Sequence, residues 1–324
     1  MQAATRWISV LLLTSATGAA ACGGDDGGVT ADAGIDAPLG DPSKLVGYFN
    51  IELRDDEPPV TSIAGIVNDK VVPEAVAWNQ SMLDGDCELL LPDVPFCSTP
   101  CNPSTEVCVA DDVCEAYAVK QDVGTVSVSG VRTSTGATTF ELTSNSNNYL
   151  VPGAITLVYP GFAAGDPLTV AATGSAFTPP FTISATGIAP LVVTNPDRDL
   201  ARNASVDLTW TPPASGATSR LHLKLDISHH GGSKGKIECD TADDGALTLS
   251  APMVTQLLDL GAAGFPTIEL TRVATGDALT TAGRVELSVT SAIERPVTVP
   301  GIISCDGDED CTPPATCQSD LTCR

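Results

Sequence analysis

The sequence predicts an all-β protein that is exported from the cytoplasm, with two β-sandwich-like domains, two small disulfide-rich modules and a long disordered N-terminal tether. The first observation behind this prediction is the N-terminus, where Arg6 and an apolar run to Leu13 have the form of a secretory signal too short to span a bilayer. The second is the eleven cysteines, which are expected to form disulfides in an exported chain. The third is a series of short runs in which apolar and polar residues alternate between Gly, Pro and Asn, as in strands joined by turns.

Three alanines, Ala19 to Ala21, lead directly into Cys22. Small residues followed by a cysteine resemble the lipobox of bacterial lipoproteins, and this resemblance implies removal of a signal peptide, residues 1–21, and lipid attachment at Cys22. Ala19 stands where a lipobox usually has leucine, and Ala-x-Ala is also the pattern of ordinary signal cleavage. A secreted, soluble protein is therefore the alternative. With the lipid, we expect an outer-membrane-anchored protein that faces the periplasm or the cell surface.

The chain is strongly acidic, with a formal net charge of -24 at pH 7. Such a surface repels nucleic-acid phosphates and anionic lipid headgroups. We therefore expect no nucleic-acid partner, and contact with the membrane only through the N-terminal lipid.

Residues 22–44 are rich in Gly and Asp and have almost no bulky apolar side chains, which predicts a disordered acidic tether. A β-rich domain is expected over 45–195 because short alternating runs resume there. Its expected strands lie at 49–53, 63–67, 76–78, 126–128, 140–142, 155–157, 168–170, 181–183 and 191–193. Asn195, Pro196 and Asp197 mark its end.

A dense cysteine module, 97–114, is inserted in this domain and contains Cys97, Cys101, Cys108 and Cys114. Because few apolar residues accompany these cysteines, two disulfides rather than a core are expected to hold the module together. Zinc is the alternative, but only the first spacing fits tetrahedral ligation and no histidine is nearby. We therefore favour disulfides.

An immunoglobulin-like β-sandwich is predicted over 196–303. Its clearest strand is 220–228, in which four aliphatic residues alternate with polar ones. Ser250 is expected to cap a short helix with Pro252 in its first turn. The other expected strands lie at 206–210, 237–239, 268–270, 285–289 and 297–299.

The chain closes with a cysteine-rich tail, 304–324, whose cysteines are evenly spaced: Cys305, Cys311, Cys317 and Cys323. The tail resembles small EGF-like and Dickkopf-like cysteine modules, and this resemblance specifies no partner. If each four-cysteine segment pairs internally, Cys87 and Cys239 remain. We predict that these two bond to each other and link the two domains.

One glycine-rich loop, 229–235, and the residue after it gather positive charge in this acidic chain. The weak candidates for a ligand loop are His229, His230, Lys234 and Lys236. They could take an anion or, with Asp226, Asp243 or Asp244, a metal ion. We favour a solvated hairpin loop instead, since adjacent histidines at a strand end would point to opposite sides.

No cofactor is expected. Asp306, Asp308 and Asp310 resemble the start of a calcium loop, but Cys311 and Cys317 stand where an EF-hand requires Gly and Glu. Only an incidental calcium site is left open. The zinc-protease motif His-Glu-x-x-His is absent from the sequence, and we expect no catalysis.

Several segments together resemble a group of cysteine-rich myxobacterial lipoproteins, namely GDCELL, FCSTPC, CVADDVC, DVGTVSVSG and ISHHGGSKGKIECDTADDG. The resemblance implies surface attachment and a β-rich, disulfide-bonded body, and it implies no activity. We therefore expect a lipid-anchored envelope protein whose β domains bind a protein or glycan partner. The alternatives are a cell-surface hydrolase that uses carboxylates or the His229/His230 loop, and a purely structural envelope component.

Overall fold

The computed structural model describes residues 39–195 and 199–324, and these are mostly β-strand, as the sequence predicts. The expected signal peptide, Cys22, most of the tether and part of the expected boundary near Pro196 lie outside the described residues. The strands of the first half are β1 (Leu45–Arg54), β2 (Val60–Val67), β3 (Ala77–Asp84), β4 (Cys87–Asp93), β5 (Glu106–Ala110), β6 (Val113–Ala116), β7 (Val126–Ser129), β8 (Thr139–Glu141), β9 (Thr143–Asn145), β10 (Asn148–Leu150), β11 (Pro167–Ala172) and β12 (Phe181–Thr186). The second half contains β13 (Val206–Thr209), β14 (Arg220–Asp226), β15 (Lys236–Ala242), β16 (Ala246–Leu249), α1 (Ala251–Asp259), β17 (Thr267–Leu279), β18 (Arg284–Pro296) and the short 3-10 helix η1 (Asp308–Asp310).

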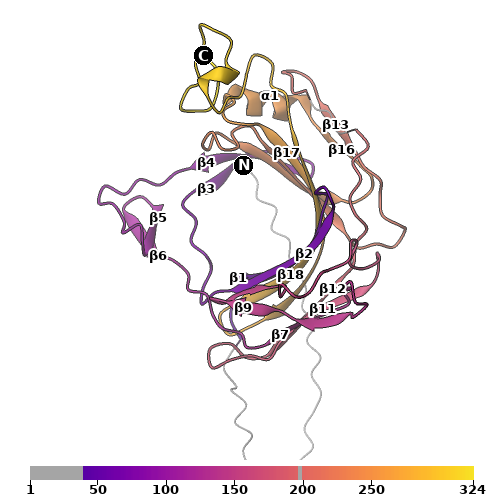
Figure 1. Ribbon diagram of the computed structural model, residues 1–324. Coiled ribbons are helices and arrows are strands. Elements are labelled where there is room, and N and C mark those ends of the chain that lie inside the picture. The colour runs from indigo at the N-terminus through magenta and orange to yellow at the C-terminus, as the bar shows by residue number, and fades with distance from the viewer. Residues whose placement is uncertain (1–38, 196–198) are drawn as a thin grey trace, which may run out of the picture. The chain divides into compact units, whose positions relative to one another are not determined.

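One ten-stranded sheet runs through the described chain in the order β3-β4-β15-β14-β17-β18-β1-β2-β10-β9. It combines strands from both sides of the expected boundary at 195/196, because β4 pairs with β15 and β1 lies parallel to β18. The sheet is curved, and two of the smaller sheets and α1 lie along one side of it, whereas the β5–β6 pair stands apart from them (Figure 1). A four-stranded sheet, β12-β11-β7-β8, covers one part, and the pair β13-β16 lies with α1 near the other.

Two hydrophobic cores lie between the large sheet and these covering elements. The first core contains Phe49, Tyr149 and Ile183 and is built mainly from residues 46–188. The second contains Trp210 and Leu257 and is built mainly from residues 191–297. Each core also takes residues from the range of the other, so neither is closed without the shared sheet.

The long hairpin β17–β18 serves both cores. Ile268 and Leu270 of β17 lie in the second core, whereas Ala274 lies in the first. Between them, at a position whose side chain faces inward, stands Arg272, which is only 1% exposed. Its cross-strand partner on β18 is the buried Ser291. A polar level therefore separates the two apolar cores along one hairpin.

The cysteines are paired as the count predicts. Cys87 of β4 is bonded to Cys239 of β15, directly opposite it in the sheet, with a Cα–Cα distance of 4.0 Å. Each four-cysteine segment is bonded within itself; the pairs are Cys97–Cys108, Cys101–Cys114, Cys305–Cys317 and Cys311–Cys323. Five disulfides in the described chain indicate a protein that folds outside the reducing cytoplasm.

Several local expectations need correction. The segments 155–157, 191–193 and 297–299 contribute only isolated bridges and not strands. Each lies beside prolines, which cannot donate to a β-ladder. The helix after Ser250 is present, but the Ser250 hydroxyl makes no capping hydrogen bond. Ordered contacts also begin before Leu45, since the Gly40 amide donates to the Thr280 carbonyl at 2.8 Å.

Among the described residues, no helix combines the length and apolar character that crossing a membrane requires.

Candidate functional site

A groove lies where the two cores meet, on the side of β17 that β14 leaves uncovered. It consists of two adjoining cavities of about 710 and 390 Å³. Four residues line both cavities: Gly165, Thr186, Thr218 and Ala274. We call the two cavities together, joined at these residues, the junction groove. The 710 Å³ cavity continues over the polar face of the large sheet, and the 390 Å³ cavity continues toward the loop 213–219.

The close approach of β12 to β17 sets one wall of the groove. A Cβ added to Gly276 would stand 1.9 Å from the Ser184 carbonyl oxygen. Only glycine at this position lets the two backbones pass so closely. Ser184 and Thr186, on the outward side of β12, then face the cavity.

The charges that line the groove are balanced. Arg220 Nε lies 2.7 Å from Asp240 Oδ1, and Arg284 Nη1 lies 2.6 Å from Glu286 Oε2. The half-buried His222 lies beside them and belongs to none of the salt bridges of the described chain. The remaining lining is mostly small, with threonines and serines among alanines and glycines. In this acidic protein, the groove is locally neutral and offers hydroxyls and one imidazole.

A buried ion pair holds the groove in place from behind. Arg272 Nε donates to Asp243 Oδ2 at 2.6 Å, and Nη2 donates to Oδ1 at 3.0 Å. Nη2 also donates to the Thr211 carbonyl, and Nη1 donates to the carbonyls of Ala189 and Pro190. All three guanidinium nitrogens, with their five N–H groups, therefore have acceptors.

Asp243 is equally well satisfied. Besides the two bonds from Arg272, its carboxylate accepts from Trp210 Nε1 at 2.8 Å and from the Ser219 hydroxyl at 2.7 Å. Four donors occupy the four lone-pair positions of the carboxylate. Because Ala189 and Ser219 also line the groove, this network joins both of its walls to the shared hairpin.

The pKa of Asp243 is lowered from its ordinary value of 3.8. Burial by itself would raise this pKa, but the hydrogen bonds from Arg272 and Ser219, the charge of Arg272 and the bond from Trp210 outweigh it. The carboxylate therefore stays ionised to a lower pH in the folded protein than in the unfolded chain.

The histidine loop does not come together as a site. His229 Nε2 lies 4.0 Å from Glu294 Oε1, whereas Lys236 lies 2.6 Å from Glu238 and over the ring of Trp78. The carboxylates considered as metal partners have other roles. Asp226 accepts a hydrogen bond from Ser228, Asp243 forms an ion pair with Arg272, and Asp244 accepts a hydrogen bond from the Ala246 amide.

The expectation that the two histidines point to opposite sides is wrong. Their ring centroids lie 3.9 Å apart. His230 has a φ of 62°, and this left-handed turn reverses the usual alternation of side chains. His230 and Lys234 are exposed and His229 and Lys236 half-buried.

The loop also contains a pattern that sequence reasoning missed. Residues 231–235, Gly-Gly-Ser-Lys-Gly, match the Gly-x-Ser-x-Gly spacing of hydrolases. In those enzymes the serine stands on a sharp turn between a strand and a helix. Here Ser233 lies in a hairpin loop between the antiparallel strands β14 and β15, so the structural context of that motif is not met.

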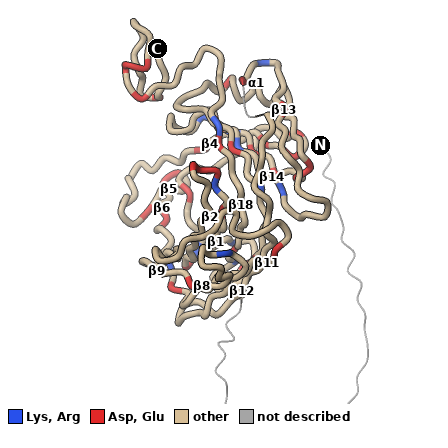
Figure 2. The backbone as a smooth tube through the Cα atoms, turned by 45° about the vertical axis from the view of Figure 1, so that its right-hand side comes forward, with Lys and Arg blue, Asp and Glu red and all other residues tan. Residues whose placement is uncertain are grey.

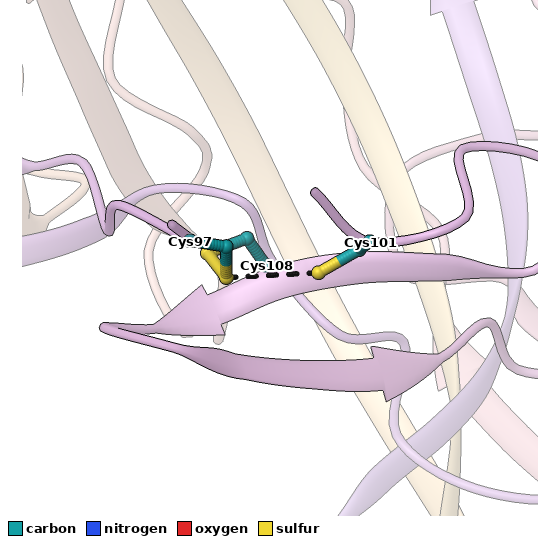
Figure 3. A group of neighbouring side chains, drawn as sticks. All are labelled: Cys97, Cys101 and Cys108. Carbon is teal, nitrogen blue, oxygen red and sulfur yellow. Dashed lines mark hydrogen bonds between the residues drawn. A yellow bond between two sulfur atoms is a disulfide. The ribbon is translucent and has the colours of Figure 1, made fainter. Parts of the chain in front are cut away.

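The first cysteine module brings three sulfurs together. The Sγ atoms of Cys97, Cys101 and Cys108 lie within 4.8 Å of one another, and those of Cys97 and Cys101 are 3.6 Å apart (Figure 3). Cys97 is bonded to Cys108, and Cys101 to Cys114. Sulfurs in disulfides are not the thiolates that bind zinc. The prediction that disulfides, and not a zinc ion, hold this module together therefore agrees with the structure.

In the C-terminal module, two of the three aspartates considered for calcium fix the backbone. Asp308 accepts from the Cys317 amide at 2.8 Å, and Asp310 accepts from the Asp306 amide at 2.9 Å. An incidental calcium site there stays a prediction.

Acidic residues are spread over many separate places along the described chain, with fewer basic ones among them (Figure 2).

Sequence reasoning missed the residues of the groove. Arg220 and His222 stand at polar positions of the alternating strand 220–228, and nothing in the sequence places segments 164–167 and 184–187 beside them. Arg272 did leave a signal, because it takes an inward position in the alternation of Ile268, Leu270 and Ala274.

Comparisons with known proteins assign no family. No family model matches the chain, and no curated protein sequence matches it. Among solved structures, the chicken CNTN1 FN1–FN3 domains match over 72% of this chain and 70% of that chain, with 8% identity and a TM-score of 0.18. A TM-score this low gives no basis for carrying over a fold or a function. The resemblance to myxobacterial lipoproteins therefore stays a prediction.

We predict that Arg272→Met lowers the free energy of unfolding by about 3–5 kcal/mol, because Asp243 would remain buried without a counter-charge. Urea denaturation measures the change. Arg295→Met is the matched control, since the salt bridge of Arg295 to Asp55 is 43% and 47% exposed and should contribute less than about 1 kcal/mol. Equal losses in the two variants would contradict the role given to the buried pair.

The lowered pKa of Asp243 predicts a loss of stability in acid. A carboxyl group whose pKa is lower in the folded state stabilises the fold above its unfolded pKa, and this stabilisation disappears as the pH falls below about 4. Between about pH 5 and pH 2.5, the wild type should lose more unfolding free energy than Asp243→Asn, which has no such group. Urea midpoints over a pH series test this, and parallel curves for the two proteins would refute it.

Proposed function

We propose that this protein is a lipid-anchored component of a bacterial cell envelope that binds a protein or glycan partner in the junction groove, without catalysis. The observation that carries the proposal is the groove itself. It is formed by segments from both halves of the chain, 164–189 and 213–286, is held by a fully hydrogen-bonded ion pair and is lined by charges that already have partners.

A preformed concave site with a few polar groups is the usual form of a binding site. The walls of this groove are joined to the shared hairpin, so a ligand would not have to order them first. Preorganisation of this kind lowers the entropic cost of binding. Because the pairs Arg220–Asp240 and Arg284–Glu286 are neutral overall, the groove suits a ligand that offers hydrogen bonds rather than strong charge.

The proposed anchoring rests on the N-terminal sequence, in which small residues precede Cys22. The disulfides of the described chain agree with an extracytoplasmic setting. The acidic surface makes a covalent lipid the more effective attachment, since charge would not hold this protein to anionic lipid. The competing functions are a hydrolase, in which the groove would convert its ligand, and a structural component, in which the groove would bind no ligand.

For the binding function, we predict that His222→Ala weakens ligand retention about tenfold, because His222 is the ionisable group of the lining that is outside the salt bridges. The full chain would be tested against envelope proteins and against a glycan array. His230→Ala is the matched control and should leave retention unchanged. If His230→Ala weakens retention and His222→Ala does not, the site lies in the loop and not in the groove. Turnover of a retained ligand would instead favour the hydrolase.

For the anchor, we predict that the wild-type chain made in a lipoprotein-processing bacterium sediments with membranes, with an intact mass of residues 22–324 plus lipid. Cys22→Ser should be released into the soluble fraction because it has no thiol to carry the lipid. Ala21→Ser keeps a small residue before the cysteine and should behave like the wild type. A soluble wild-type chain that begins at Cys22 without added mass would show ordinary secretion instead.

A further inference from the structure

Part of the β17 edge has no hydrogen-bonded partner strand, although β12 packs closely at Gly276. β17 pairs with β18 along its whole length, from Thr267 to Leu279. On the other side β14 pairs only as far as Arg220 opposite Val273. Within the described chain, residues 274–279 therefore have a strand on one side only, although β17 is an interior strand of the sheet.

The chain that leads into β14 does not pair with this edge. The Ser219 hydroxyl donates to Asp243 Oδ2, which also accepts from Arg272 Nε of β17. Ser219 is thus fixed at the level of the buried ion pair, one residue before the pairing of β14 with β17 begins. Residues 213–218 then form a separate loop, with the Ala217 amide bonded to the Ala214 carbonyl. The space where β14 would have continued is left to the groove.

The cavities reach the first two residues of this edge. The 710 Å³ cavity is lined by Val273, Ala274 and Thr275, and the 390 Å³ cavity by Ala274. Six residues in extended form span about 20 Å. Across from the edge stand small residues, among them Gly165, Gly187 and Ala189, which leave room for the side chains of an added strand.

We propose that the junction groove binds an extended polypeptide segment of a partner protein, which adds to the sheet as a strand beside residues 274–279 of β17. This inference rests on the proposed binding function and specifies its ligand. Unpaired backbone N–H and C=O groups in a row are complementary to another backbone in extended form. A glycan offers hydroxyls but no such regular row of donors and acceptors.

The locally neutral lining supports the same ligand. Its arginine and carboxylates are already paired, so the main-chain groups of the edge are left to supply the hydrogen bonds. Recognition of this kind takes affinity from the backbone and specificity from side-chain pockets. The outer strand β3 also has a free edge, but its ladder with β4 is shifted between Gln80 and Met82. Such bulges protect edges from strand addition.

The first test is hydrogen exchange of the full chain without ligand, followed by mass spectrometry. Amides of residues 274–279 should exchange faster than those of 267–272, which have strands on both sides. Equal protection of the two segments would overturn the proposal, because the edge would then be covered.

The second test uses a phage-displayed library of linear random peptides, selected on the full chain. A selected peptide should protect residues 274–279 from exchange, and methylation of alternate amides in the peptide should abolish binding. Thr186→Lys places a long charged side chain in the groove and should weaken binding at least tenfold. Thr182→Lys is the matched control on the same outward side of β12, lies outside the lining of both cavities and should change binding less than twofold.

The outcomes separate this inference from the proposed function. Peptides that bind without responding to Thr186→Lys, or whose amides tolerate methylation, overturn strand addition. If no peptide binds but a glycan is retained and lost in Thr186→Lys, the groove is a glycan site and only this inference fails. If neither kind of ligand responds to Thr186→Lys or His222→Ala, both the inference and the proposed function fail.

Discussion

The ion pair between Arg272 and Asp243 is the interaction on which the rest of this structure depends. Both side chains are almost completely buried, at 2% and 1% exposure, and a buried charge is tolerated only when it is paired and hydrogen-bonded. Every N–H of the guanidinium and every acceptor position of the carboxylate is used. The pair accepts hydrogen bonds from Trp210 and Ser219 and donates to the carbonyls of residues 189, 190 and 211. Four separate parts of the sequence, 189–190, 210–219, Asp243 and Arg272, therefore meet at one point.

This point determines where the two cores end. An apolar residue at position 272 would let the cores merge along β17 and β18, whereas the arginine requires polar partners from the chain that crosses there. The crossing segment also bonds to β18, because the Leu191 amide donates to the Ser291 hydroxyl at 3.0 Å. The same polar level fixes Ala189 and Ser219, which line the groove. A structural requirement of the core and a candidate binding site thus share the same residues.

The sequence predicts the fold class well because it rests on local signals. Alternation in 220–228 and 285–289 specifies buried faces of strands, and counting the cysteines predicts the Cys87–Cys239 bond. It does not predict the shared sheet, since the parallel pairing of β1 with β18 joins residues about 240 positions apart with no local signal. The groove is missed for the same reason. His222 has the sequence context of any solvent-facing residue, and only the distant segment that includes Thr186 turns its surroundings into a cavity. The burial of Arg272 could have been predicted from the sequence, because an arginine at an inward position of an alternating strand requires a buried partner.

The central claim is that a shared hairpin and a buried ion pair make the two cores one cooperative unit. Hydrogen exchange resolved by segment, measured over a urea series, tests this most directly. The account predicts that β7, β11 and β12 of the first core lose protection at the same urea concentration as β13, β16 and α1 of the second. Two separate midpoints, with one core still protected where the other exchanges freely, would contradict it.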